Sequence, residues 1–121
     1  MGTTALIVDD HRGFRASARV LLEMEGFEVV GEAEDGASAV AAADALRPDM
    51  VLLDVQLPDS RGFEVADELM GRGLTRQVVL VSSRAASDYG DQITTSAAVG
   101  FLSKSDLSGP ALRELLCGRP A

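Results

Sequence analysis

The chain has 121 residues, of which 46% are hydrophobic and 25% charged, the composition of one globular domain spanning residues 1–121. Its formal net charge of −8 disfavours direct binding to nucleic acid or to an anionic membrane. A single cysteine, Cys117, excludes an internal disulfide and a zinc site built from several cysteines. No apolar run approaches the roughly 20 residues that span a bilayer, and no signal-peptide pattern is present, so we expect a cytoplasmic protein.

The first half of the chain alternates short apolar runs with segments of helical periodicity. Continuous apolar runs are typical of strands buried on both faces, and apolar residues three or four apart are typical of helices. In chain order, these patterns predict a strand at 5–8, a helix at 12–25, a strand at 27–30, a helix from Asp35-Gly36 to Pro48 and a strand at 50–53. Gly26 and Pro48 are helix-ending residues, which supports both helix boundaries.

The second half continues this alternation and contains one weak element. In chain order, it predicts a helix at 62–70, a strand at 78–81, a helix at 87–98, a strand at 100–102 and a helix from Ser108 and Pro110 to Leu116, ended by Gly118 and Pro120. Gly90 interrupts the fourth helix and Thr94-Thr95 are poor helix formers, so we expect it to be weak. Five strand–helix units predict an α/β fold, a parallel sheet with helices on both faces.

Polar side chains follow the predicted strands at their carboxyl ends, where ligands bind in open α/β sheets. Asp9 and Asp10 follow the first strand, Asp54 follows the third, Ser82 the fourth, and Lys104 comes shortly after the fifth. Carboxylates crowd together only where positive charge lies between them, and Mg²⁺ (or Mn²⁺) prefers such oxygen ligands. We therefore predict a divalent-cation site, with Asp54 as a nucleophile that accepts a phosphoryl group and with Lys104 and Ser82 assisting.

These residues resemble the receiver domain of two-component response regulators, the CheY-like superfamily, from about Thr4 to Leu116. The matching segments are Leu6-Ile7-Val8-Asp9-Asp10, Asp54-Val55-Gln56-Leu57-Pro58-Asp59 with Gly62, Val79-Leu80-Val81-Ser82-Ser83 and Gly100-Phe101-Leu102-Ser103-Lys104. The resemblance implies a three-layer, flavodoxin-like sandwich whose five parallel strands have the order 2-1-3-4-5. It also implies a metal site and a set of responding residues. The implied metal ligands are Asp9, Asp10, Asp54 and the backbone carbonyl of Gln56, and the residues that respond to phosphorylation of Asp54 are Ser82, Phe101 and Lys104.

The resemblance implies a signalling switch, not an enzyme that turns over substrate. A sensor histidine kinase or phosphotransfer protein would supply the phosphoryl group, and the chain would assist its own phosphorylation and dephosphorylation. The surface formed by 87–98, 100–102 and the last helix would then change its affinity for an output protein, which the sequence does not name, or for a second copy of the chain. The 17 residues after Lys104 are too few for a helix-turn-helix output domain, so we expect a stand-alone receiver or a fragment of a longer regulator.

Two positions depart from the family pattern. Ser105 stands where many members have proline after the lysine, so we expect a trans Lys104–Ser105 bond. Phe101 stands in place of tyrosine, so it can pack but cannot make a hydroxyl hydrogen bond. Gln56 and Arg84 are expected to flank the site and to set how fast water attacks the acyl phosphate.

Other interpretations of the same residues stay in view. Asp10 also suits a helix cap and Asp54 a turn, while His11 is interpreted as a solvent-facing loop residue and Cys117 as a helix-packing one. A rival function is a phosphatase or phosphotransferase with Asp54 as nucleophile. Such enzymes usually carry a second acid two residues later, where this chain has Gln56. A third is a pseudo-receiver that only mediates protein contacts.

Overall fold

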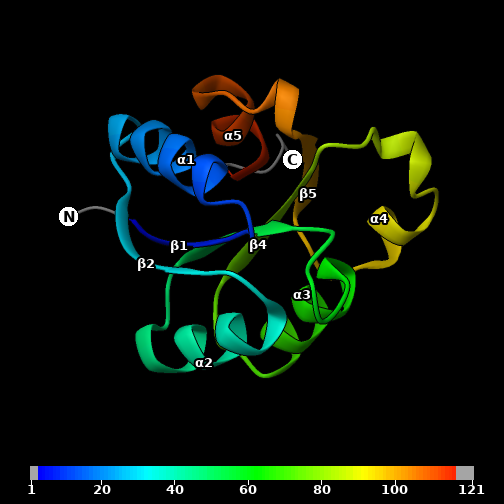
Figure 1. Cartoon of the computed structure of the whole chain (residues 1–121), viewed down its shortest axis with the longest axis horizontal. Helices are drawn as coiled ribbons and strands as arrows, with labels where there is room; N and C mark the ends of the chain where they lie inside the picture. The colour runs from blue at the N-terminus through cyan, green and yellow to red at the C-terminus, as the bar shows by residue number, and fades with distance from the viewer. Residues whose placement is uncertain (1–2, 117–121) are drawn as a thin grey trace.

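Five parallel strands form one sheet in the order β2-β1-β3-β4-β5 (Figure 1). The computed structural model describes residues 3–116. The strands are β1 (Thr4–Val8), β2 (Glu28–Ala33), β3 (Met50–Asp54), β4 (Gln77–Ser82) and β5 (Gly100–Ser103). The predicted α/β class, three-layer architecture and strand order are confirmed.

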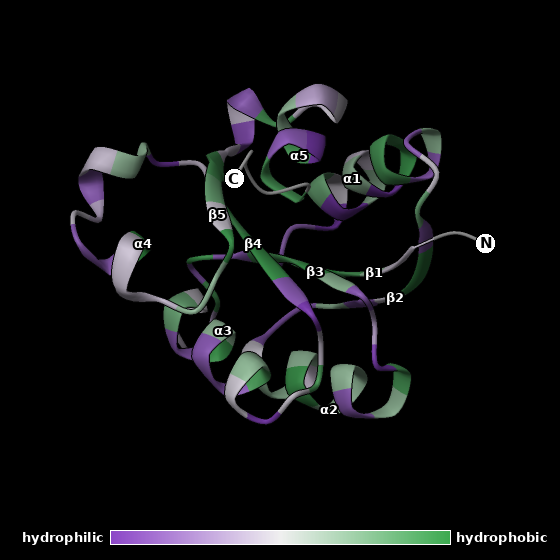
Figure 2. Ribbon diagram, turned by 180° about the vertical axis from the view of Figure 1, so that it is seen from behind, coloured by the Kyte–Doolittle hydropathy of each residue, from purple (hydrophilic) through white to green (hydrophobic). Residues whose placement is uncertain are grey.

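Helices lie on both faces of this sheet, as Figure 1 shows: α1 and α5 on one face, α2 and α3 on the other, and α4 beyond the β5 edge. The helices are α1 (Arg12–Met24), α2 (Gly36–Leu46), α3 (Gly62–Gly71), α4 (Gln92–Thr95) and α5 (Gly109–Leu116), with 3-10 turns η1 (Ala86–Asp88) and η2 (Lys104–Asp106). Hydropathy colouring shows largely apolar inner strands between helices of mixed polarity (Figure 2).

The central strands are apolar on consecutive residues because they are buried on both faces. In β1, Leu6 and Val8 pack into the cluster under α2 and α3, whereas Ala5 and Ile7 pack into the cluster under α1 and α5. All four side chains are fully buried. Because successive side chains of a strand point to opposite faces, one apolar run contributes to both cores. Because the strands are parallel, their polar carboxyl ends lie together at one edge of the sheet.

The predicted single helix at 87–98 is wrong. The structure instead has the 3-10 turn η1 and the four-residue α4, with Gly90 between them at a φ of +59°. The hydroxyls of Thr94 and Thr95 both donate to the backbone carbonyl of Asp91, at 3.1 and 3.0 Å. Side chains that bond the local backbone compete with helical hydrogen bonds, so the helix stays short.

Other boundaries move by a few residues. β2 runs to Ala33 instead of ending at residue 30, and β3 and β4 include Asp54 and Ser82 as their last residues. The expected helix ends at Gly118 and Pro120, and the packing role of Cys117, lie outside the described residues. Within residues 3–116, no helix is both long and apolar enough to cross a membrane.

Candidate functional site

Three carboxylates and one imidazole gather where the neighbouring strands β1 and β3 end. Asp9, Asp10, His11 and Asp54 each offer a ligand atom, and these atoms all lie within 4.8 Å of one another. Asp9 is fully buried and Asp54 is 3% exposed, whereas Asp10 faces solvent. The adjacency of β1 and β3 in the sheet therefore brings together the acids predicted from the strand ends.

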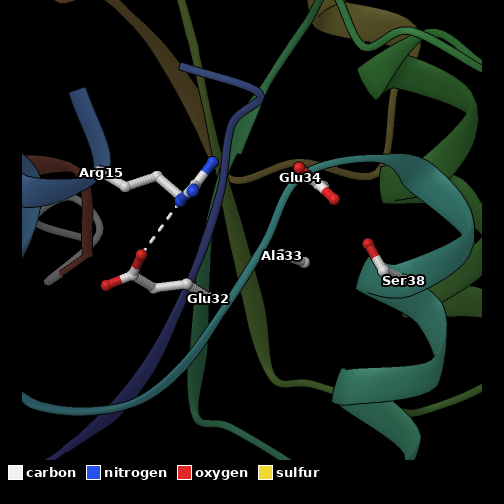
Figure 3. Close-up of a pocket in the computed structure, with 5 residues that line it drawn as sticks. All are labelled: Arg15, Glu32, Ala33, Glu34 and Ser38. Atoms are coloured by element: carbon white, nitrogen blue, oxygen red, sulfur yellow. Dashed lines mark hydrogen bonds and ion pairs between the residues drawn. The ribbon is translucent and has the colours of Figure 1, made fainter. Parts of the chain in front are cut away.

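The loop that carries Asp9 is anchored by α1. Arg15 donates from Nη1 to the Asp9 backbone oxygen at 2.6 Å and from Nε to Glu32 on β2 at 2.9 Å, the bond drawn in Figure 3. Arg19 also pairs with Glu32. Burial acts to raise the pKa of Glu32, but the two guanidiniums outweigh it and hold that pKa below its usual value. This ion-paired cluster fixes the acidic loop against α1 and β2.

The other side of the acidic cluster is set by the turn after β3. The backbone N–H of Gln56 donates to Asp54 Oδ1 at 3.2 Å, and Gly62 N–H donates to the Val55 carbonyl at 2.6 Å. A Cβ at position 62 would overlap the backbone oxygen of Asp54 and lie 2.8 Å from the Val55 Cα. Glycine at 62 therefore lets the start of α3 approach the backbone beneath the nucleophile.

The same turn is fastened to α2 through Asp59. Its carboxylate accepts hydrogen bonds from the backbone N–H groups of Gly36 and Ala37, at 2.8 and 3.1 Å. These bonds hold the pKa of Asp59 below its ordinary value, because they favour the charged carboxylate. Asp35 caps the same helix through Ser38. The loop after Asp54 is thus tied to a second element.

Lys104 reaches this cluster from beyond β5. Its Nζ lies 2.6 Å from Asp9 Oδ2 and 3.7 Å from Asp54 Oδ2, and it sits 4.3 Å from the centre of the Phe14 ring. No cis peptide occurs in residues 3–116, so the Lys104–Ser105 bond is trans as predicted. The ammonium is therefore closer to Asp9 than to the expected partner Asp54, with Phe14, which sequence reasoning missed, beneath it.

Burial and like charge raise the pKa of Asp54 to about 6. Removal from water is the larger cause and the Asp9 charge adds to it, while Lys104 and the Gln56 N–H act in the opposite direction. The carboxyl is still mainly ionised at neutral pH. A carboxylate in this state is an available nucleophile and gains from any added positive charge.

One buried oxygen of the cluster makes no aligned hydrogen bond within residues 3–116. Asp9 Oδ2 is buried and accepts no aligned hydrogen bond from the described residues, although Lys104 Nζ is at ion-pair distance. The contact with Lys104 is therefore an ion pair in which the charges are close but the hydrogen-bond geometry is poor. Three clustered carboxylates, one of which has a buried oxygen without an aligned hydrogen bond in the described part of the chain, fit a hard divalent cation.

His11 is solvent-facing as predicted, with 71% of its side chain exposed, but it also contacts the site. Its Nδ1 lies 3.1 Å from both Asp9 Oδ1 and Asp10 Oδ1, and its backbone N–H donates to Asp9 Oδ1 at 2.8 Å. The imidazole therefore contacts two of the carboxylates. The position of His11 directly after Asp9 and Asp10 in the sequence could have indicated this contact.

Ser82 ends β4 and is 1% exposed. Its Oγ accepts from the backbone N–H of Arg84 at 3.0 Å and lies 2.6 Å from the hydroxyl of Tyr89. The ring of Tyr89 in turn packs edge-on against Phe101, the predicted switch aromatic, with centroids 5.8 Å apart. Sequence reasoning missed Tyr89; its only signal is that it is the single tyrosine of the chain, set in a polar segment.

Gln56 and Arg84 line a common groove of about 460 Å³ beside the site. The groove is bordered by Val55, Gln56, Leu57, Ser60, Arg61, Arg84, Asp88 and Tyr89. Val55 and Gln56 directly follow Asp54 in the chain, so the groove lies beside the end of β3. Its position agrees with the expected flanking placement of Gln56 and Arg84, whose roles stay predictions.

The family model of the response regulator receiver domain matches residues 5–115. The chain belongs to this family. The receiver domain is 36% identical over 106 residues to the virulence transcription regulator BvgA of Bordetella pertussis, which covers 88% of this chain and 51% of BvgA. It is 34% identical over 102 residues to the DNA-binding transcriptional activator EvgA of Escherichia coli K12, covering 84% and 50%. The chain thus spans about half the length of these relatives.

Solved structures agree with this assignment. The signal receiver domain of the response regulator NarL from Mycobacterium tuberculosis has a TM-score of 0.83 and 32% identity to this receiver domain, over 98% of each chain. A LuxR-family two-component response regulator from Aurantimonas has a TM-score of 0.85 and 27% identity, covering 100% of this chain and 89% of that one. The resemblance that the motifs indicated is therefore confirmed at the level of family and fold.

Proposed function

We propose that this receiver domain is a phosphoacceptor switch in which Asp54 takes up a phosphoryl group beside Mg²⁺ (or Mn²⁺). The observation that supports this most is the cluster of Asp9, Asp10 and Asp54 carboxylates with the Lys104 ammonium beside it. Asp9, Asp10, Asp54 and the backbone carbonyl of Gln56 would hold the cation. When bound, the cation would neutralise charge on the phosphoryl oxygens.

A phosphohistidine of a sensor histidine kinase or a phosphotransfer protein would be the donor. An Asp54 carboxylate oxygen attacks phosphorus, and the bond from phosphorus to the donor imidazole nitrogen breaks as the new P–O bond forms. The imidazole leaves with that electron pair and takes up a proton. Asp54 contributes a nucleophile held by β3 and by the Gln56 N–H, so little motion is needed for the attack. Such a donor implies a cytoplasmic location, because a histidine kinase takes its phosphoryl group from cytoplasmic ATP.

The response would follow from the new phosphoryl oxygens. Lys104 would move its ammonium from Asp9 toward them, and the Ser82 hydroxyl would donate to another. The segment after β4 would shift, and Phe101 would turn into the space released. The surface of α4, β5 and α5 would then change its affinity for an output protein or a second copy. Gln56 and Arg84, in the groove beside Asp54, would set the lifetime of the acyl phosphate.

The nature of the output follows from the relatives only as a proposal. BvgA and EvgA are named as transcription regulators, which supports a role upstream of transcription. The formal charge of −8 argues against direct nucleic-acid contact by this chain itself. In this proposal the chain acts on transcription through an output protein, as a switch and not as an enzyme that turns over substrate.

The test is adduct formation with a small-molecule donor. The protein is incubated with Mg²⁺ and acetyl phosphate or beryllofluoride, and the adduct is measured by intact mass or by titration calorimetry. We expect one adduct per chain, lost in Asp54→Asn and kept in Asp59→Asn, which removes a carboxylate five residues away that caps α2. An adduct that survives Asp54→Asn contradicts the proposal.

Two further outcomes separate the rival functions. Continuous hydrolysis of many phosphorylated small molecules, abolished by Asp54→Asn, would indicate a phosphatase or phosphotransferase. Neither adduct nor Mg²⁺ binding at millimolar concentration would indicate a pseudo-receiver that acts through protein contacts alone. The glutamine at position 56 disfavours the first rival, because that position carries no second acid.

A further inference from the structure

Tyr89 is the one buried residue of the segment between β4 and β5, where Ile93 and Ala98 are partly buried against the same core. Within residues 83–99, all of which the structure describes, it alone is buried, with 6% of its surface exposed. Its backbone joins η1 to α4, since Tyr89 N–H donates to the Ala86 carbonyl and Gln92 N–H donates to the Tyr89 carbonyl. This side chain is therefore the most deeply buried attachment of the 83–99 segment to the rest of the domain.

The Tyr89 ring is held between two other aromatic rings. Phe63, in the first turn of α3, packs edge-on with its centroid 5.4 Å away, and Phe101 on β5 packs edge-on at 5.8 Å. Edge-to-face pairs at such separations are favourable and specific in geometry. Tyr89 thus links the 83–99 segment to α3 on one side and to the predicted switch aromatic on the other.

The hydroxyl at the end of this ring is buried against Ser82. The two oxygens are 2.6 Å apart, and Ser82 Oγ also accepts from Arg84 N–H. A serine hydroxyl has one proton to donate and two lone pairs. Phe101 on β5 has no hydroxyl. The hydroxyl that contacts Ser82 comes instead from Tyr89, in the segment between β4 and β5.

We propose that Tyr89 is a positioning residue that holds Ser82 in the unphosphorylated arrangement, and that the phosphoryl group on Asp54 competes with the Tyr89 hydroxyl for Ser82. This inference rests on the proposed function. If the Ser82 side chain rotates so that its Oγ moves from Tyr89 to a phosphoryl oxygen, the Tyr89 hydroxyl loses its partner. A buried hydroxyl without a partner is unfavourable, so the ring is driven outward.

The groove on the Tyr89 flank offers the place for that movement. Tyr89 lines it together with Asp88, Arg84 and Gln56, and its volume is about 460 Å³. A ring that leaves its place between Phe63 and Phe101 carries η1 with it and frees the face of Phe101. Loss of the Ser82–Tyr89 hydrogen bond would thereby change the α4–β5 surface through movement of the Tyr89 side chain.

The test compares beryllofluoride affinity, by calorimetry with Mg²⁺ present, in wild type, Tyr89→Phe, Ser82→Ala and the double variant. Tyr89→Phe keeps the aromatic contacts and removes only the competing hydroxyl. We expect it to bind beryllofluoride about 2- to 10-fold more tightly than wild type, the range of one hydrogen bond. In the Ser82→Ala background the same change should have no effect, because the contested partner is absent.

Equal or weaker affinity of Tyr89→Phe overturns the inference, as does an equal tightening in the Ser82→Ala background, which would point to general loosening of the core. A wild-type protein that binds no beryllofluoride overturns the proposed function, and this inference with it. The two failures are thus distinct.

Wild type alone gives a second measurement. Tyr89 is the only tyrosine and the chain has no tryptophan, so its intrinsic fluorescence reports on this ring alone. We expect the emission to change along the same saturation curve as the heat. Emission that stays constant through full saturation overturns the outward movement.

Discussion

At the β1–β3 side of the site, the polar groups are held by buried strands and by loops bonded to neighbouring elements. At the β4–β5 side they depend on an exposed segment with one buried residue. Arg15 fastens the Asp9 loop and Asp59 fastens the turn after Asp54. Residues 83–99, in contrast, are mostly exposed, with Tyr89 as their one buried side chain and with Ile93 and Ala98 partly buried. The difference suggests a division of labour, with a rigid side that places the nucleophile and a loosely held side that can respond.

Replacing Gly62 should give the largest effect and tests the rigid side. In Gly62→Ala the new Cβ meets the backbone of Asp54 and Val55, which cannot give way as a flexible side chain can. We expect the free energy of unfolding to fall by about 1–3 kcal/mol, as for overpacked sites. Gly71→Ala at the end of α3 is the matched control, because nothing lies within 4 Å of its Cβ. Equal stabilities by urea denaturation would contradict a tightly built turn.

Asp54→Asn should have the next largest effect, and it should stabilise the protein in the absence of divalent metal. The folded carboxyl has a pKa of about 6, against an ordinary value of 3.8, because burial and Asp9 disfavour its charge. Its contribution to stability is therefore fully present below about pH 3.8 and is lost as the pH rises through about 6. Removing the charge should raise the free energy of unfolding at neutral pH by about 1–2 kcal/mol.

The measurement is urea denaturation in EDTA at several pH values. The gap between Asp54→Asn and wild type should open between about pH 4 and 6 and should narrow when Mg²⁺ is added, because the cation stabilises the carboxylate of wild type. A gap that does not vary with pH would mean that the burial of this charge has little energetic weight.

The rigid side is also the part that could be predicted from the sequence. Runs such as residues 5–8 and 50–53 identify buried strands, and the rule that parallel strands end at one edge brings Asp9 and Asp54 together. The strand order came from the family resemblance and not from periodicity. Local pattern was sufficient here because each acid follows its strand directly.

The responding side could not be predicted in the same way. Tyr89 meets Ser82, Phe63 and Phe101 through contacts between elements whose relative placement no local pattern encodes. The contact of Lys104 with Phe14 joins residues 90 positions apart (104 − 14) and is equally invisible to periodicity. The failed helix at 87–98 has a local cause that the sequence did contain, in Gly90 and Thr94-Thr95, but its extent was overestimated.

Phe14→Leu should give a moderate effect at the junction of the two sides. The ring lies under Lys104 Nζ at 4.3 Å, and a cation–π contact of this kind contributes about 0.5–1 kcal/mol where it is partly exposed. Without it Lys104 is less ordered before it meets the phosphoryl oxygens. We expect beryllofluoride affinity to fall about 2- to 5-fold. Phe27→Leu is the control, since Phe27 packs on the same core cluster. Equal losses in both variants would assign the effect to packing alone.

The smallest effect is expected for Thr94→Ala with Thr95→Ala in α4. Both hydroxyls bond the Asp91 carbonyl, and alanine is the better helix former, so the change should lengthen or firm this helix. Because both residues are exposed, the global free energy of unfolding should stay within about 0.5 kcal/mol of wild type. Hydrogen exchange should nevertheless slow at the amides of residues 92–96, while the amides of β1 and β3 exchange at unchanged rates. Since those strands open only with global unfolding, slowing that extends to them would mean that the 83–99 segment unfolds together with the sheet and that the two sides are one cooperative unit.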